Sequence, residues 1–250
     1  MTAWVDSHSH LHMSERESAD LLERARAVGV EWVVCPGTDA PGSEESARLA
    51  AAHPGVVLAT SGLHPHQASE WPEQRSRIES LAAEASAVGE CGLDFYRNLS
   101  PPDSQREAFR DQLDLALQLD KPIIVHCRDA FSEVYEDIER SGHQRVVLHC
   151  WTGGPKWTRR FDELGVTFSF AGPVTFAGGG TVRLAAAVVP RERTIVETDT
   201  PYLTPPPNRN LPNEPANVVR IGEALAEVWE ATVDEVARLT TAEATRVFRG

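Results

Sequence analysis

The chain has 250 residues, of which 41% are hydrophobic and 24% charged, and its formal net charge at pH 7 is −13. This balance is typical of a globular protein, and no apolar run is long enough to cross a bilayer. The negative charge argues against a broad basic surface of the kind that binds duplex nucleic acid, so any nucleic-acid binding should be local.

The start of the chain and the cysteines point to a cellular environment. The first residues are polar and lack a basic and then apolar leader, so we expect a cytoplasmic protein with no membrane association. The four cysteines include no Cys-x-x-Cys pair, which argues against a zinc ribbon and a thioredoxin-type motif. We expect buried free thiols, and no obligate protein partner is evident.

Short β-rich segments recur along the whole chain and alternate with helical patterns. The expected strands cover residues 3–7, 31–35, 56–62, 87–91, 122–127, 145–150, 166–172 and 194–199. Helical spacing marks residues 18–29 and 104–120, and closing helices are expected near 216–230 and 233–248. The alternation predicts an α/β fold, a (β/α)8 TIM-type barrel, with a doubly wound open sheet as the alternative. No linker or composition shift is visible, so residues 1–250 are expected to form a single domain.

Polar side chains interrupt the apolar strands at their carboxyl ends. In a barrel these ends meet at one mouth, where active sites of this fold are built. Alternation along a strand also turns His126 toward the barrel axis if Val125 and Cys127 pack against the helices. The residues expected at the mouth are His8, His10, Glu90, His126, His149 and Asp199.

Imidazole and carboxylate groups packed together without a cation would be poorly compensated, and a metal centre relieves that problem. Such groups are ligands for zinc, manganese, iron or nickel, and this set exceeds what one tetrahedral ion needs. We therefore predict two divalent ions with Glu90 as the bridge between them. Neither Lys121 nor Lys156 lies at the carboxyl end of a strand, where a carboxylated lysine could take that place. The first ion is assigned to His8, His10, Glu90 and Asp199, and the second to Glu90, His126 and His149.

Seven stretches spread over the chain carry a resemblance to a known family: "DSHSHLH" (6–12), "GLHPH" (62–66), "GECGLDFYR" (89–97), "KPIIVHCRDA" (121–130), "VVLHCWTGG" (146–154), "ETDTPYL" (197–203) and "NEPANV" (213–218). They resemble the TatD family of metal-dependent deoxyribonucleases, within the wider amidohydrolase-like barrels. The resemblance implies a TIM-type barrel, two divalent ions and hydrolysis of DNA phosphodiesters, exonucleolytic from a 3′ end. The chain departs from the family pattern at His12, Gly154 and Pro212.

The family resemblance and the ligand types differ in the metal that they favour. Family nucleases are often associated with magnesium, whereas histidine-rich ligation suits zinc or manganese. The expected cofactors are therefore two divalent ions, Mg, Mn or Zn. Such a pair lowers the pKa of a bound water toward neutrality, supplies the nucleophile and stabilises charge on the phosphorus oxygens.

Two further side chains are candidates for catalysis. Asp199 could orient the water and accept its proton, with purely structural ligation as the alternative and Glu197 as a competitor for the role. His64 could bind the phosphate or assist the leaving oxygen, with a packing role as the alternative. His66 is the weaker candidate.

Residues of the expected mouth loops could bind the substrate, which we expect to be DNA with single-stranded or frayed ends. Arg97 and Arg128 could hold phosphate. Tyr96, Trp151 and Tyr202 could stack on unpaired bases, with aromatic packing as the alternative. Two other functions remain open from the sequence: a bimetallic amidohydrolase or lactonase acting on a small carbonyl substrate, and a catalytically silent binding barrel.

Overall fold

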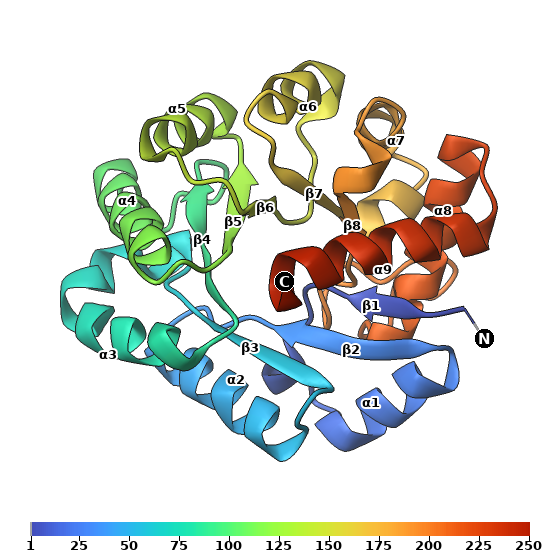
Figure 1. The fold of residues 1–250 in the computed structure, drawn as a ribbon, viewed down its shortest axis with the longest axis horizontal. Coiled ribbons are helices and arrows are strands. Elements are labelled where there is room, and N and C mark those ends of the chain that lie inside the picture. The colour runs from blue at the N-terminus through green and yellow to red at the C-terminus, as the bar shows by residue number, and fades with distance from the viewer. Residues whose placement is uncertain (1) are drawn as a thin grey trace.

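A computed structural model describes residues 2–250 of the chain. All strands pair in parallel and in sequence order within one eight-stranded sheet. The strands are β1 (Trp4–Asp6), β2 (Val30–Cys35), β3 (Val57–Ser61), β4 (Ala87–Asp94), β5 (Ile123–Arg128), β6 (Val146–Leu148), β7 (Thr167–Phe170) and β8 (Thr194–Val196). Figure 1 shows the helices arranged as a ring around these strands.

A helix follows each strand, and α9 is added at the end. The helices are α1 (Ser18–Ala27), α2 (Ala40–Ala52), α3 (Trp71–Glu84), α4 (Pro102–Gln118), α5 (Phe131–Ser141), α6 (Gly154–Asp162), α7 (Gly180–Ala186), α8 (Val218–Trp229) and α9 (Val233–Arg249). The four helices whose ranges the sequence predicted are α1, α4, α8 and α9. Each is found within two residues of its expected bounds.

Backbone hydrogen bonds connect the last strand to the first. Ser7 N donates to Val196 O at 3.0 Å, and Asp199 N donates to His8 O at 2.9 Å. An isolated parallel bridge joins Ser9 to Thr200 just beyond the strand ends. The sheet is thus a nearly closed barrel, so the predicted (β/α)8 fold is confirmed and the open doubly wound alternative is wrong.

Strand bounds differ from the sequence prediction where the functional residues lie. β4 extends to Asp94, three residues beyond its expected end, whereas β6 ends at Leu148 and β8 at Val196. Just after these two strands the backbone leaves the sheet, since Cys150 and Asp199 have φ values of 46° and 57°. A period-two pattern in the sequence does not reveal where this departure begins.

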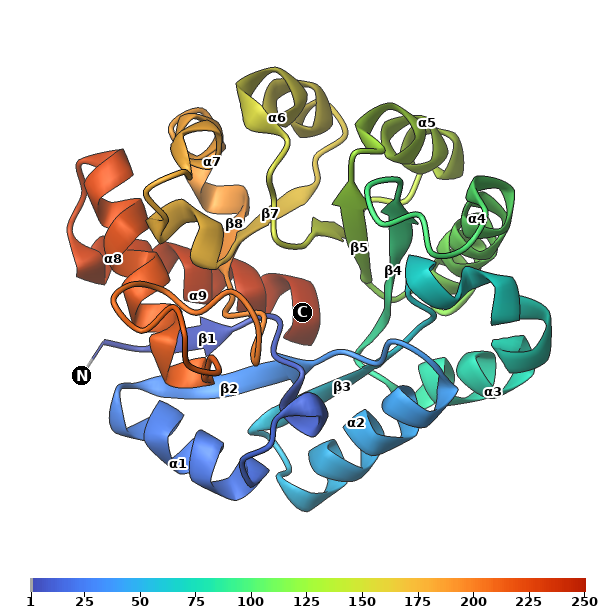
Figure 2. The ribbon, with the colours of Figure 1, turned by 180° about the vertical axis from the view of Figure 1, so that it is seen from behind.

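Two of the buried apolar clusters lie on opposite sides of the sheet. Inside the barrel, alternate strand residues such as Ile124, Val147 and Ile195 pack with Phe248 of α9. Figure 1 shows α9 lying across this end of the barrel, and Figure 2 shows the opposite end, where the loops after the strands gather. Val125 and Cys127 belong to the outer cluster, between sheet and helices, as predicted.

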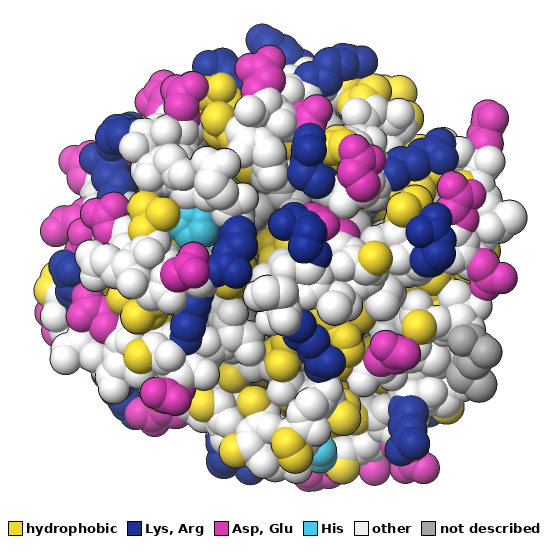
Figure 3. Space-filling view, in the orientation of Figure 1, with side chains coloured by type: hydrophobic (Ala, Val, Ile, Leu, Met, Phe, Trp, Pro, Cys, Tyr) yellow, Lys and Arg dark blue, Asp and Glu magenta, His cyan; other side chains and the backbone are white. Residues whose placement is uncertain are grey.

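The cysteines are free, with Cys35, Cys91 and Cys127 buried and Cys150 partly buried. Within residues 2–250, none of the helices combines the length and apolar character needed to span a bilayer. Figure 3 shows cationic and anionic side chains interspersed on the face around α9.

The two lysines have positions remote from the strand ends at the mouth. Lys121 donates hydrogen bonds from Nζ to the carbonyl oxygens of Ala82 and Ala85, at 2.7 and 2.6 Å, at the end of α3. A cation there satisfies carbonyls that the helix leaves without partners. Lys156 is exposed on α6. Lys121 therefore has a structural role in capping α3.

Candidate metal centre

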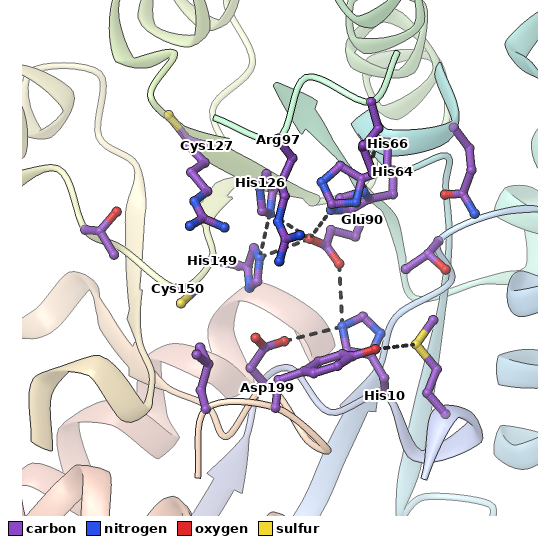
Figure 4. Close-up of a pocket in the computed structure, with 18 of the residues that line it drawn as sticks. His10, His64, His66, Glu90, Arg97, His126, Cys127, His149, Cys150 and Asp199 are labelled. Carbon is purple, nitrogen blue, oxygen red and sulfur yellow. Dashed lines mark hydrogen bonds and ion pairs between the residues drawn. The ribbon is translucent and has the colours of Figure 1, made fainter. Parts of the chain in front are cut away.

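The six predicted ligands converge at the carboxyl end of the barrel. Figure 4 shows Glu90 in the middle, with His10 and Asp199 on one side and His126 and His149 on the other. These side chains come from five different strands or the residues just after them. Residues that are scattered along the sequence therefore form one cluster.

The first group of ligands gathers around one oxygen of Glu90. His8 Nε2 lies 3.1 Å from His10 Nε2 and 3.3 Å from Glu90 Oε2. His10 Nε2 lies 3.6 Å from the same oxygen and 3.4 Å from Asp199 Oδ1. This is the set predicted for the first ion.

The second group gathers around the other oxygen of Glu90. Oε1 lies 3.0 Å from His149 Nε2 and 3.1 Å from His126 Nδ1, and these two nitrogens are 3.3 Å apart. Glu90 thus presents one oxygen to each group, as a bridging carboxylate would.

Close backbone contacts place Glu90 at this position. A Cβ on Gly62, just after β3, would lie 2.5 Å from the Cα of Gly89, and Gly89 itself has a φ of 118°. Only glycine permits both the approach and the positive φ. Glu90 N also donates to Gly37 O at 2.8 Å. The strand is therefore fixed where the carboxylate enters the mouth.

The chemistry of these donors fits divalent metal ions. Zinc-type ligands lie about 2.0–2.2 Å from the ion, which places neighbouring ligand atoms roughly 3.3 Å apart. The atoms of each group have such spacings. Two imidazole nitrogens at 3.1 Å also cannot both carry protons, so at least one lone pair points into the group. A cation between them would compensate these buried donors.

Burial and charge act in opposite directions on the two carboxylates. Burial disfavours the charged form of Glu90, but the imidazoles of His149, His64 and His8 outweigh it and hold the pKa of this carboxyl well below its usual value. Burial likewise opposes the charge of Asp199, and a hydrogen bond from His10 lowers its pKa below the usual value. Both side chains are therefore ionised at neutral pH, as metal ligands must be.

The histidines of the two groups differ in their protonation. Burial, helped by the nearby His149, lowers the pKa of His8, which favours the neutral ring that binds metal. His149 is also buried, but Glu90 and Glu197 raise its pKa well above the usual value. Metal binding at the second group would thus release a proton from His149.

Carboxylates behind the second group orient its imidazoles. Glu197 Oε1 lies 3.0 Å from His149 Nδ1, while Glu197 Oε2 accepts a hydrogen bond from Ser169 at 2.5 Å. Such partners fix the ring and its tautomer in metal sites. Glu197 is fully buried behind His149, whereas Asp199, in the same segment after β8, lines the pocket.

Asp94 is a functional candidate that the sequence analysis missed. Its Oδ2 lies 3.3 Å from His126 Nε2 and 2.9 Å from His66 Nε2. Burial opposes its charge, but hydrogen bonds from His126, Arg97 N and His66 lower its pKa. The signal was its position, four residues after Glu90 on the same strand and hence on the same face.

His64 also contacts the bridging carboxylate, with Nε2 3.3 Å from Glu90 Oε1. The backbone N–H of His66 donates to His64 Nδ1 at 3.2 Å, so in the neutral ring the proton belongs on Nε2 and is donated to Glu90. Burial lowers the pKa of His64 to about 4, which favours that neutral form. His64 lines the pocket, and its catalytic role stays a prediction.

A cavity of about 810 Å³ is lined by five of the six predicted ligands: His10, Glu90, His126, His149 and Asp199. Arg97 and Arg128 line it on the side of β4 and β5, and neither makes an ion pair with any residue of the range 2–250. The guanidinium of Arg128 lies 4.0 Å from the ring centre of Tyr96, which is 62% exposed. Tyr202 also lines the cavity and is 55% exposed, with its ring centre 6.2 Å from that of His10. These four residues are therefore available at the mouth.

Trp151 is the exception among the predicted substrate-binding residues. It is 1% exposed, and its ring packs edge-on against Phe131, Phe161 and Phe168. Its indole N–H donates to Thr158 at 2.8 Å. A ring enclosed in this way cannot stack on a base, so the expectation for Trp151 was wrong and the alternative of aromatic packing holds.

His12, which departs from the family pattern, lies outside both ligand groups. Its Nδ1 lies 3.4 Å from the thiol of Cys35, and its ring centre lies 6.1 Å from that of His10. Burial lowers the pKa of His12 to about 4. It is thus a partly buried neighbour of the first group.

Comparison with known proteins gives a consistent result. The family model described as TatD related DNase matches residues 5–249. The metal-dependent hydrolase YabD of Bacillus subtilis is 36% identical and covers 98% of both chains. A protein of Rahnella named 3'-5' ssDNA/RNA exonuclease TatD is 36% identical over 94% of this chain and 93% of its own.

A solved structure agrees with these sequence relatives. The TatD homologue YJJV of Escherichia coli superimposes with a TM-score of 0.88 at 26% identity, and the match covers 99% of this chain and 98% of that one. The similarity extends over the full barrel and includes all the strands that carry the ligand groups. The chain belongs to the TatD related DNase family of metal-dependent hydrolases.

Proposed function

We propose that this protein is a 3′-5′ exodeoxyribonuclease that hydrolyses DNA at single-stranded or frayed ends with the help of two divalent ions. The observation that carries the proposal is the division of Glu90 between two donor groups, with Oε2 near His8 and Oε1 near His149. Paired ions bridged in this way suit in-line displacement at phosphorus, because they stabilise both the attacking and the leaving oxygen.

Charge supports a phosphodiester substrate despite the acidic composition. Two divalent ions bring roughly +4, and Glu90 and Asp199 return −2, so the centre carries about +2. The unpaired guanidinium groups of Arg97 and Arg128 add to this positive region. The pocket can thus attract a polyanion that the surface as a whole, at −13, would repel.

The depth of the site supports single-stranded ends as the substrate. His10, Glu90 and His149 are at most 6% exposed, and they line a cavity whose volume is typical of small-ligand pockets. A strand end can enter such a cavity, whereas a paired duplex is too broad. Tyr96 and Tyr202 at the rim can stack on the unpaired bases that follow.

Within this proposal Asp199 orients the attacking water and accepts its proton, because its carboxylate lies at the edge of the first group and faces the pocket. His64 holds the substrate phosphate or assists the leaving oxygen from the opposite side of Glu90. The relative from Rahnella is named for both ssDNA and RNA, so RNA belongs among the substrates to be compared.

The test uses single-stranded DNA labelled at its 5′ end, with Mg, Mn or Zn and with EDTA. We expect stepwise shortening from the 3′ end that EDTA abolishes, and slower cleavage of blunt duplex. RNA and a panel of amides and lactones are assayed in parallel. Turnover of a lactone or amide with intact DNA would favour a carbonyl hydrolase, and tight DNA binding without any turnover would favour a silent barrel.

A pair of matched variants tests the role of Asp199. Asp199→Asn should lower the turnover rate by about 10²-fold or more while DNA binding changes little, because a general base is lost. Asp129→Asn is the control, since Asp129 is an exposed aspartate of the mouth with a similar φ of 52°. Equal loss of binding and turnover in Asp199→Asn would indicate a structural role instead.

A further inference from the structure

The loop after β8 contains a buried amide that the proposed function does not use. Asn213 begins the "NEPANV" stretch and is 1% exposed, although exposed residues precede it in the same loop. An amide removed from water needs hydrogen-bond partners for its oxygen and for both its hydrogens. The partners of Asn213 therefore show what its side chain holds in place.

Both polar atoms of the Asn213 side chain, Oδ1 and Nδ2, have hydrogen-bond partners. Nδ2 donates to Thr198 O at 2.8 Å and to Tyr202 O at 2.7 Å. Oδ1 accepts from Glu214 N at 2.9 Å and from Asn217 Nδ2 at 2.8 Å. Two carbonyls on one side and two N–H groups on the other leave only one orientation for the amide.

The two carbonyls that accept from Asn213 belong to residues on either side of Asp199. Asp199 has a φ of 57°, in the left-handed region that non-glycine residues rarely occupy. Such a conformation is strained and persists only where the surroundings hold it. Asn213 N also donates to Pro201 O at 2.9 Å, so Asn213 holds the loop at three carbonyls, those of Thr198, Pro201 and Tyr202.

Contacts on the other side of the same segment complete the arrangement. Thr198 donates to the carboxylate of Asp6 from N at 2.8 Å and from Oγ1 at 2.6 Å. Asp199 N donates to His8 O at 2.9 Å. These bonds anchor the segment to β1, and Asn213 anchors it to the outer loop, so Asp199 is held from both sides.

We propose that Asn213 is a positioning residue that holds Asp199 in the left-handed conformation from which its carboxylate joins His8 and His10. This inference rests on the proposed metal centre. The same amide fixes the backbone of Tyr202, so it also sets the distance between the first ligand group and the aromatic residue at the rim. Without these bonds the carboxylate of Asp199 would leave the first group, while the second group around Glu90 Oε1 would remain.

The test measures metal affinity of the purified full chain by competition with a chelator, using zinc and manganese separately. Asn213→Asp keeps the size of the side chain but replaces the donating Nδ2 with an oxygen, which cannot donate to the two carbonyls. Asn213→Ala removes the donors without adding charge. We expect affinity for one ion to fall by about 10–100-fold, as for other residues that orient ligands, and affinity for the other to change little. Asn210→Asp, an exposed residue of the same loop, is the matched control.

A purely structural role would give a different result. It predicts a lower melting temperature but unchanged affinity for both ions in the folded variant, and that outcome would overturn the proposal. If neither variant folds, Asn217→Ala removes one of the two hydrogen bonds that Asn213 Oδ1 accepts, and the same selective loss is expected in milder form. Two ions bound by wild-type protein that leaves DNA intact would contradict the nuclease proposal alone, since the affinity measurement needs no DNA.

Discussion

Glu90 makes the most contacts within the site. Its two oxygens lie within 3.6 Å of the imidazoles of the four predicted histidine ligands, and His64 is a further neighbour. Removing this carboxylate leaves those rings facing one another with no shared anion. Their lone pairs alone cannot neutralise two closely spaced dications. Both ions are therefore expected to depend on this one side chain.

We expect Glu90→Ala to lose most bound metal and all hydrolytic activity. Metal content per chain is measured by mass spectrometry after dialysis. Glu84→Ala, an exposed glutamate at the end of α3, should keep wild-type metal content. Full activity in Glu90→Ala would rule out a bridging role.

His143 lies away from the site, so its effect on the pH dependence of stability can be measured separately from that of the site histidines. Burial lowers its pKa, and its ring accepts from Arg145 N at 3.1 Å and lies 3.0 Å from Lys121 O. The folded protein therefore binds this proton less tightly than the unfolded chain, whose histidine pKa is about 6.5. Its contribution to stability is present above that value and is lost as the pH falls below it.

We therefore expect the wild-type melting temperature to fall more steeply than that of His143→Gln between about pH 7 and pH 5. The comparison removes the contribution of the site histidines, which both proteins share. Parallel curves for the two proteins would mean that His143 does not titrate differently in the folded state.

The convergence of the proposed ligands could be predicted from the sequence where residue type and strand position were sufficient. His126 and Glu90 were recognised because a polar residue in an apolar strand must face the mouth or the axis. Trp151 was misplaced because its loop position does not reveal which way the ring turns, and only the packing against Phe161 decides it. Asp94 was missed because β4 was expected to end before it, at residue 91.

At the scale of elements, α9 closes the end of the barrel opposite the metal centre. Phe248 is 7% exposed and packs edge-on against Trp32, with ring centres 6.3 Å apart. The helix was predicted near residues 233–248 from its apolar spacing. Its place inside the barrel end could not be predicted, because apolar spacing gives the buried face of a helix and not its partner.

We expect Phe248→Ala to lower the free energy of unfolding by about 3–5 kcal/mol, as for other large-to-small changes in a core. Urea denaturation followed by circular dichroism measures this. Leu184→Ala on α7, where the side chain is 60% exposed, should change it by about 0.5 kcal/mol or less. A similar effect in both variants would contradict the role of Phe248 as a core residue.

At the scale of the whole molecule, the proposed metal binding should be linked to folding stability. The ligands come from β1, β4, β5 and the segments after β6 and β8, so ions held between them connect distant parts of the barrel. An ion bound only by the folded state, at a concentration a hundred times its Kd, contributes about 2.7 kcal/mol. Chelation should therefore weaken the entire barrel.

We expect EDTA to lower the melting temperature by about 5–10 °C, since 1 kcal/mol shifts a protein of this size by roughly 2–4 °C. Unfolding should be a single transition if residues 1–250 form one domain. Calorimetry with and without EDTA measures both quantities. The melting temperature of Glu90→Ala should not respond to EDTA. If EDTA lowered it as much as that of the wild type, the stabilising metal would be bound elsewhere than at the proposed site.

The position of Lys121 against the carbonyls of α3 has a consequence for how the centre assembles. In barrels that bridge their ions with a carbamate, dissolved carbon dioxide must first react with a lysine amine. Here that amine is engaged at the end of a helix, and Glu90 supplies a carboxylate that is present from synthesis. Reconstitution should accordingly proceed in degassed, bicarbonate-free solution, with the supply of metal as the sole requirement.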